Sequence, residues 1–129
     1  DNPITTGFVD DRTGILFSSD CFGALLPAVP QDAADLGTDE LQAGQVRWTT
    51  IDSAWVHDVD RQVFGRSLAE LRALEPTMVC SSHLPPAPGA MLDLFVDSLA
   101  MTPDAERFVG PDQATLEAML AGMADAPIG

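Results

Sequence analysis

The sequence has no lysine, few cysteines and no long apolar run, and each absence excludes a class of protein. All six residues of fixed positive charge are arginine, against 20 aspartates and glutamates, which gives a formal net charge of −14. Such a surface repels phosphate backbones and anionic lipid headgroups, so we expect neither a nucleic acid nor a membrane as partner. No apolar stretch reaches the ~20 residues of a membrane-spanning helix, and no segment resembles a signal peptide.

The cysteine count and the chain length limit the architecture. Cys21 and Cys80 are too few for a disulfide framework, which favours a reduced, cytoplasmic protein. With 129 residues, 46% of them hydrophobic, the chain can build one core but not two. It opens with Asp1-Asn2-Pro3 and no initiator methionine. We therefore expect residues 1–129 to form a single partial domain, cut from a longer polypeptide.

The pattern of apolar residues predicts an α/β domain. Residues 4–9 and 15–18 are rich in β-branched and aromatic types, and the turn 10–14 between them offers Gly14 for a positive φ, which predicts a β-hairpin. Residues 77–81 predict a short buried strand. Helical spacing and cap signals predict helices over residues 38–54, 58–74, 91–99 and from 112 onward. The last of these is expected to bury Leu116, Met119, Leu120 and Met123.

Local signals refine the ends of these elements. Thr38 is expected to cap the first helix, and Asp58 or Asp60 the second. The Pro-rich loop 84–89 is expected to continue neither a strand nor a helix. Trp48 and Trp55 lie seven residues apart, a helical spacing that indicates packing in the core or against a partner.

Two strand ends deliver side chains that can bind a metal. Strand 15–18 leads to Asp20, and strand 77–81 leads to His83. Loops at strand ends carry functional residues because the strands fix their positions, and carboxylate and imidazole are common ligands of transition metals. Judged on the residues alone, other interpretations stay open: Asp20 caps the amides of the following turn, and His83 is a polar residue satisfied within its loop.

The segment around Asp20 also carries a family resemblance. Residues 15–23, ILFSSDCFG, resemble the LFSxDxFG segment of the metallo-β-lactamase fold, and are most similar to the branch of flavodiiron, oxygen-binding di-iron proteins. There, as here, a hairpin turn comes first, and an amphipathic helix then leads to a short strand ending in Ser-His and a Pro- or Gly-containing loop. The resemblance covers roughly residues 3–90. It implies the C-terminal half of a metallo-β-lactamase-like αββα sandwich.

The resemblance implies a site as well as a fold. Asp20 resembles the bridging carboxylate of a dinuclear centre of zinc or iron, and His83 resembles its last histidine ligand. The family's main ligand run, of the type H-x-[HE]-x-D-H, precedes the hairpin and has no counterpart in this sequence. We therefore expect the two-metal site to be incomplete in this chain, and the chain alone to be inactive. Possible supporting residues around the metals are Ser19, Cys21, Cys80 and Ser82.

Three functions follow as hypotheses. The first is a dinuclear-metal hydrolase, in which zinc lowers the pKa of a bound water. The second is a di-iron protein that binds O₂ or NO and receives electrons from a separate donor protein. The third is an interaction module with no metal, in which Asp20 and His83 would lie far apart.

The half-sandwich also predicts partners. One sheet face and the hairpin edge would lack their neighbours, so we expect association with the missing N-terminal half, and self-association of this chain alone. Buried, inert thiols are expected at Cys21 and Cys80, the alternative being contact with the metal or with each other. Residues 57–60, HDVD, are expected to be a solvated helix start, the alternative being a metal or acid–base cluster.

Overall fold

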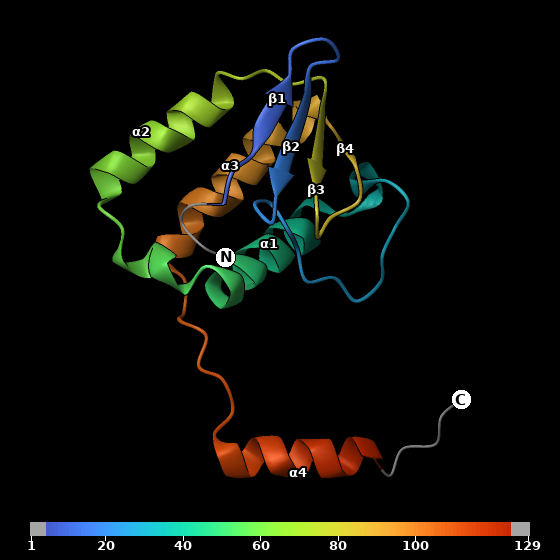
Figure 1. The fold of residues 1–129 in the computed structure, drawn as a ribbon, viewed down its shortest axis with the longest axis vertical. Coiled ribbons are helices and arrows are strands. Elements are labelled where there is room, and N and C mark those ends of the chain that lie inside the picture. The colour runs from blue at the N-terminus through green and yellow to red at the C-terminus, as the bar shows by residue number, and fades with distance from the viewer. Residues whose placement is uncertain (1–4, 125–129) are drawn as a thin grey trace.

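The computed structural model describes residues 5–124 as a mixed sheet with α-helices packed against it. Figure 1 shows the order of the elements along the chain. The strands are β1 (Phe8–Asp10), β2 (Ile15–Ser19), β3 (Met78–Ser81) and β4 (Ala87–Pro88); the α-helices are α1 (Thr38–Asp52), α2 (Arg61–Arg72), α3 (Leu92–Met101) and α4 (Gln113–Ala124). Short 3₁₀ turns are η1 (Ala33–Asp35), η2 (Ala54–Asp58), η3 (Gly89–Met91) and η4 (Thr102–Asp104).

The sheet has the strand order β1-β2-β3-β4, with β1 and β4 antiparallel to their neighbours and β2 parallel to β3. The predicted hairpin is confirmed: Gly14 has φ 72°, and Asp10 accepts hydrogen bonds from the Arg12 amide at 3.2 Å and the Thr13 hydroxyl at 2.5 Å. The first strand begins at Phe8 rather than at residue 4, which lies outside the described residues. Because β2 and β3 pair in parallel, their carboxyl ends, which are far apart in the sequence, lie at the same edge of the sheet.

The Pro-rich loop after β3 does not continue that strand, as predicted, but it ends in a short strand that the sequence did not indicate. Ala87 and Pro88 pair with Val79 and Met78 to form the short strand β4. The reason is position, because β4 is the edge strand of the described sheet, where a proline without an N–H can be accommodated. The Gly89 amide then donates to the Thr77 carbonyl at 3.0 Å and continues the pairing into the next turn.

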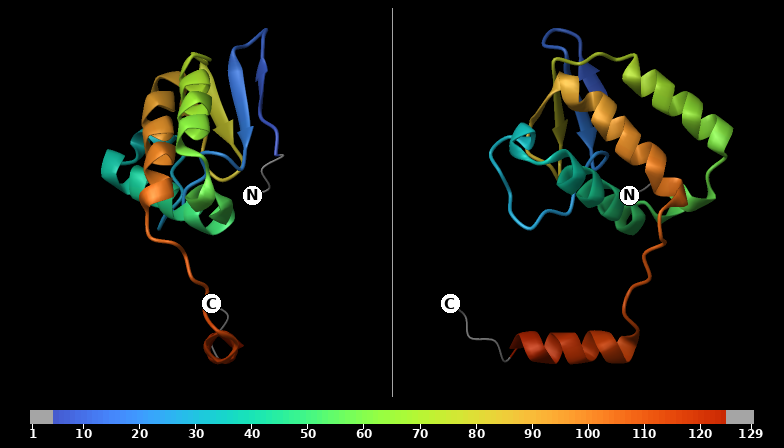
Figure 2. Two further views of the ribbon diagram at one scale, coloured as in Figure 1. Left: turned by 90° about the vertical axis from the view of Figure 1, so that its left-hand side faces the viewer. Right: turned by 180° about the vertical axis from the view of Figure 1, so that it is seen from behind.

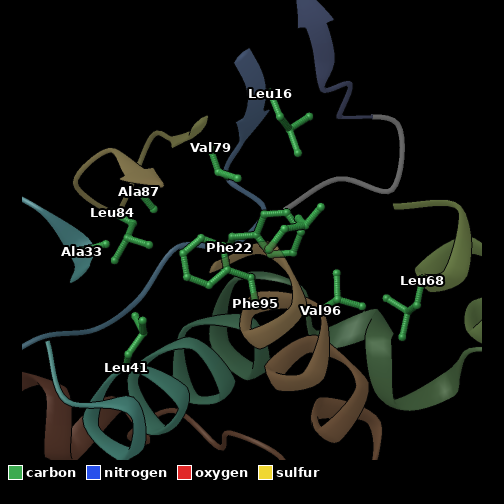
Figure 3. Packing of buried hydrophobic residues seen from close by; sticks show 11 residues of the cluster. Leu16, Phe22, Ala33, Leu41, Leu68, Val79, Leu84, Ala87, Phe95 and Val96 are labelled. Atoms are coloured by element: carbon green, nitrogen blue, oxygen red, sulfur yellow. The ribbon is translucent and has the colours of Figure 1, made fainter. Parts of the chain in front are cut away.

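Helices α1, α2 and α3 lie on one side of the sheet (Figures 1 and 2). The hydrophobic core lies between these helices and the strands. Phe22 and Phe95 face each other at its centre, with ring centroids 5.6 Å apart (Figure 3). The buried cluster takes residues from the strands, the helices and the loops between them: Leu16, Phe22, Ala33, Leu41, Leu68, Val79, Leu84, Ala87, Leu92, Phe95 and Val96. This core holds the carboxyl ends of β2 and β3 in place.

The opposite face of the sheet carries apolar side chains that remain exposed. Because side chains alternate along a strand, Leu16 and Val79 face the helices while Phe17 and Met78 face away from them. Phe8 stacks on Phe17 with centroids 4.9 Å apart, and the two residues are 61% and 36% exposed. An uncovered apolar sheet face of this kind is what half of a two-sheet sandwich would have.

The first two helices follow the sequence closely but differ at their ends. Asp60 caps α2 as predicted, accepting from the amides of Gln62 at 2.8 Å and Val63 at 2.9 Å. Helix α1 begins at Thr38 with Gly37 at the cap position, so the prediction of Thr38 as the cap is wrong. Trp55 lies beyond the end of α1, in η2, and does not share a helix with Trp48.

Helix α4 forms where predicted, but its apolar side chains are not buried. Asp112 accepts from the Thr115 amide at 2.8 Å at the helix start. The segment 105–112 leads α4 away from the other helices (Figure 1), and its apolar residues are exposed: Leu116, Met119, Leu120 and Met123. Helical periodicity identifies the apolar face of a helix, but it does not determine whether another part of the chain packs against that face. Among the described residues, no helix combines the length and the apolar character that crossing a membrane requires.

Candidate metal site

Asp20 and His83, the two predicted ligands, are in direct contact. His83 Nε2 lies 3.1 Å from Asp20 Oδ1. Their side chains are 32% exposed for Asp20 and 44% for His83, so both can still reach a ligand from solvent. The contact forms because β2 and β3 run parallel and end at the same edge, with Ser19 paired to Ser81. The expectation that Asp20 and His83 lie far apart, made for an interaction module without a metal, is therefore wrong.

The backbone that presents Asp20 is irregular on both sides of it. The register between β2 and β3 shifts between Phe17 and Ser19, and two non-glycine residues, Ser19 (φ 54°) and Phe22 (φ 66°), adopt the left-handed region. Such conformations cost about 1–3 kcal/mol each and gather at functional sites, as bulges do. They turn the chain sharply enough to aim Asp20 toward the end of β3.

Hydrogen bonds in the turn do not require the Asp20 carboxylate. The Cys21 amide donates to the Ser18 carbonyl at 3.1 Å, and the Gly23 amide donates to the Asp20 carbonyl at 3.2 Å. Backbone oxygens thus take the role that the capping interpretation gave to the side chain. The carboxylate instead faces His83.

The loop that carries His83 is tied to the same turn through its backbone. The Ser82 amide donates to the Ser19 carbonyl at 2.8 Å, and the Ala24 amide donates to the His83 carbonyl at 3.1 Å. The Ser81 hydroxyl adds a bond to the Ser19 carbonyl at 3.2 Å. Ser19 and Ser82, proposed from the sequence as supporting residues, are placed beside the pair in this way, and a metal-related role for them stays a prediction.

The two cysteines lie near the site, and both are free and half-buried. Burial raises the pKa of the Cys21 thiol to about 11, which opposes formation of the thiolate that a metal would bind. Cys80 pairs across the sheet with Phe17. The interpretation of an inert thiol is therefore favoured for Cys21.

Alkylation of Cys21 is expected to be slow in the folded chain. At pH 8 a thiol of pKa about 11 is ionised to roughly one part in 10³, against about a quarter for a free cysteine of pKa ~8.5. The higher nucleophilicity of the more basic thiolate recovers part of this difference, so we expect at least a tenfold slower reaction with iodoacetamide than in denaturant. Mass spectrometry of a Cys80→Ser variant measures it, and equal rates would contradict the burial of this thiol.

The positions of the two donors fit one side of a metal coordination shell. Two ligands bound to one zinc or iron through bonds of ~2.0–2.1 Å lie about 2.9–3.4 Å from each other. The observed 3.1 Å between Oδ1 and Nε2 falls in that range, and a carboxylate with an imidazole suits either metal. Within residues 5–124 no group of three or more potential ligands converges. The donor pair therefore fits part of a shell, and ligation by Asp20 and His83 stays a prediction.

The second histidine does not join this pair. His57 lies in η2, and its Nε2 atom is buried without a hydrogen-bond partner among the described residues. Its neighbour Asp58 forms an ion pair with Arg107 at 2.6 Å, and Asp60 caps α2. The contacts of Asp58 and Asp60 therefore support the interpretation of this segment as a solvated helix start.

Sequence analysis missed two residues of the site, Trp48 and Gly23. The Trp48 Nε1–H donates to the Asp20 carbonyl at 3.1 Å, and its ring centroid lies 4.3 Å from that of His83. Gly23 leaves room for the Trp48 ring and the Cβ atom of His83. Trp48 is separated from Asp20 by 28 residues, and no local pattern indicates that α1 crosses beneath the turn.

Cavities open on both sides of the pair. A cavity of about 620 Å³ beside His83 is bounded by the two loops 24–31 and 82–86 and by Trp48. A smaller one of about 180 Å³ is bounded by Asp20, Trp48 and Trp55, among others. The larger cavity is within the size range of small-molecule sites and is mainly apolar, with His83 among its polar groups.

Comparison with known proteins gives one informative result. No protein-family model and no curated protein matches the sequence. The structure, however, is similar to rubredoxin:oxygen oxidoreductase (ROO) from the anaerobe Desulfovibrio gigas. The likeness is one of fold. It has a TM-score of 0.60 at 12% sequence identity, over 79% of this chain and 25% of that protein.

The similarity confirms the predicted fold class at a coarse level. The neighbour is a flavodiiron protein of the metallo-β-lactamase fold, and at this identity the relationship is a distant one of fold. The mixed sheet with helices on one face is compatible with part of such a domain. The chain spans about a quarter of the neighbour's length.

Proposed function

We propose that this chain contributes Asp20 and His83 to a dinuclear metal site in a larger metallo-β-lactamase-like protein. The observation that carries the proposal is the 3.1 Å contact between Asp20 Oδ1 and His83 Nε2 at the ends of two parallel strands. In this proposal the Asp20 carboxylate and His83 Nε2 would be two of the protein groups that hold the metals. As the family resemblance implies, the remaining ligands would come from a ligand run that this sequence does not contain; within residues 5–124 no third ligand converges on the pair.

Of the two chemistries that the sequence suggested, we favour the di-iron one. The support is the fold likeness to an oxygen oxidoreductase, together with the local resemblance of residues 15–23 to the di-iron branch. Two irons would supply the reduction of O₂ or NO, with electrons delivered by a separate donor protein. Asp20 and His83 would hold the metals, and the chain by itself would be inactive. The alternative is a zinc hydrolase, which uses the same donor types. Identifying the metal in the longer protein would distinguish the two.

The uncovered sheet face supports a proposal about partners. Phe8, Phe17 and Met78 expose apolar surface, and strand alternation places them on the side of the sheet opposite the helices. In the intact protein we propose that the N-terminal half of the domain covers this face, completing a two-sheet sandwich. Without that half, the same surface would be buried by association between copies of this chain.

Metal affinity tests the proposed ligands. Zn²⁺ binding, measured by competition with a chromogenic chelator, is expected to weaken at least ~10-fold in His83→Ala and in Asp20→Asn, because each removes one of only two protein donors. His57→Gln and Asp11→Asn are the matched controls, since they remove the same kinds of group elsewhere and should leave the affinity unchanged. Equal affinity in the wild-type chain and His83→Ala would contradict the proposal.

Self-association tests the partner proposal. Light scattering of the wild-type chain is expected to show a mass that rises with concentration, and Phe8→Lys/Phe17→Lys to lower it toward the monomer, because lysine on an exposed sheet face opposes pairing. Leu120→Lys on α4 is the control that separates the sheet face from the exposed helix. A sharp wild-type monomer over a wide concentration range would contradict the half-domain proposal.

A further inference from the structure

Trp48 contacts both members of the Asp20–His83 pair. Its indole Nε1–H donates to the Asp20 carbonyl at 3.1 Å, and its ring lies against the His83 ring with centroids 4.3 Å apart and planes tilted by 36°. Asp20 and His83 come from two strand ends 63 residues apart, and a single rigid side chain from a third element contacts both. An aromatic ring placed in this way restricts the His83 imidazole, while the N–H fixes the backbone from which Asp20 projects.

The sequence makes room for this arrangement at Gly23. A Cβ atom at that position would lie 2.6 Å from Trp48 Nε1 and 2.9 Å from His83 Cβ. Real Cβ contacts are essentially never under 3.0 Å, so a side chain at Gly23 would push Trp48 away from both partners. The close meeting of the turn, the indole and the His83 loop thus depends on glycine, because glycine allows close approach of backbone to other groups.

Helix α1, which carries Trp48, is anchored to the same turn by two further bonds. The Gln45 side-chain amide donates to the Phe22 carbonyl at 3.1 Å, and the Leu25 amide donates to the Gly44 carbonyl at 3.1 Å. Gln45 is 3% exposed and Leu41, one turn earlier, is fully buried. The support for the indole is therefore a packed helix rather than a loop, which is what accurate placement of ligands requires.

We propose that Trp48 is a positioning residue that holds Asp20 and His83 at the separation of two ligands on one metal. The metal-related role of Trp48 rests on the proposed function. Its restraint of the His83 ring does not, and can be measured in the metal-free chain. Residues that orient metal ligands typically change metal affinity by ~10–100-fold when they are replaced. Trp48 acts on His83 through its ring and on Asp20 through its N–H, so Trp48→Phe removes the N–H contact while keeping an aromatic ring, and Trp48→Leu removes both contacts.

The first measurement needs no metal. NMR relaxation of the ¹³C-labelled His83 ring in the full chain is expected to give an order parameter in the rigid range, about 0.85, that falls below about 0.6 in Trp48→Leu. Trp48→Phe keeps an aromatic ring beside His83 and should recover most of the order. Phe108→Leu is the control, because this aromatic residue is exposed in the segment before α4, and it should leave the His83 ring unchanged. If Trp48→Leu does not fold, Trp48→Phe decides: it should retain most of the ring order and yet lose part of the metal affinity, because it keeps an aromatic ring beside His83 but has no N–H for the Asp20 carbonyl.

The second measurement is Co²⁺ affinity of the same variants, read from their visible absorption. We expect Trp48→Leu to bind at least ~10-fold more weakly than the wild-type chain, with Trp48→Phe between them and Phe108→Leu equal to the wild type. Unchanged order of the His83 ring in Trp48→Leu would overturn the positioning role. So would a Trp48→Phe variant in which both the ring order and the Co²⁺ affinity are unchanged. Loss of ring order in Trp48→Leu while the wild-type chain binds no Co²⁺ at His83 would support the positioning role and contradict the proposed function instead.

Discussion

Replacing Phe95 by alanine is expected to lower the free energy of unfolding by about 3–5 kcal/mol, the largest effect of any truncation in the core. Phe95 is 1% exposed, and its ring lies 5.6 Å from that of Phe22 between α3 and the turn after β2. Truncation would leave a cavity directly behind the turn that presents Asp20. Urea denaturation followed by circular dichroism measures the change.

Phe108→Ala is the matched control for this experiment. Phe108 is 45% exposed and lies in the segment before α4, so the same chemical change there is expected to stay within about 0.5 kcal/mol. Equal destabilisation by the two variants would mean that the core does not sit between the sheet and α3, contrary to the fold described above. A large loss for Phe95→Ala alone supports it.

Gly89→Ala is expected to destabilise the chain by about 3 kcal/mol or more, because the added Cβ cannot be accommodated without moving the backbone. That atom would lie 1.7 Å from the Pro76 carbonyl oxygen. Relief of the clash would require breaking the bond of 3.0 Å from the Gly89 amide to the Thr77 carbonyl, which joins the β4 end to the start of β3. Thermal unfolding measures the loss.

Gly65→Ala serves as the opposite control. Gly65 lies within the exposed part of α2, and a Cβ there meets nothing within 4 Å. The same substitution should therefore raise stability by about 0.5–1 kcal/mol, the difference in helix propensity between the two residues. If Gly89→Ala were as well tolerated as Gly65→Ala, the path of the chain between β3 and α3 would be wrong.

Local chemistry was enough to predict much of the fold. The hairpin follows from the turn 10–14, because Asp10 and Gly14 supply the side-chain bonds and the positive φ that the turn needs. Helix α2 follows from Asp60 and the helical spacing after it. What local chemistry could not predict is long-range pairing. The parallel register of β2 with β3 joins residues more than 60 positions apart. The strand that contains Pro88 depends on pairing with Met78 and Val79 across the intervening loop.

The candidate site was predictable only in part for the same reason. Asp20 and His83 were identified because each follows an apolar strand and because residues 15–23 resemble a known segment. Their contact depends on parallel pairing, which no local pattern encodes. Trp48 was missed because its role depends on where α1 passes beneath the turn. Helix α4 shows the converse limit, since a clear apolar face at Leu116 and Leu120 remains exposed.

Locating a bound metal tests the central claim most directly. Co²⁺ added to the ¹⁵N-labelled chain produces pseudocontact shifts that fix the position of the ion relative to the fold. We predict one dominant position within bonding distance of His83 Nε2 and Asp20 Oδ1, which lie 3.1 Å apart, and its loss in His83→Ala. Co²⁺ spread over the acidic surface, or centred away from these two atoms, would contradict the claim that the ends of β2 and β3 form part of a metal site.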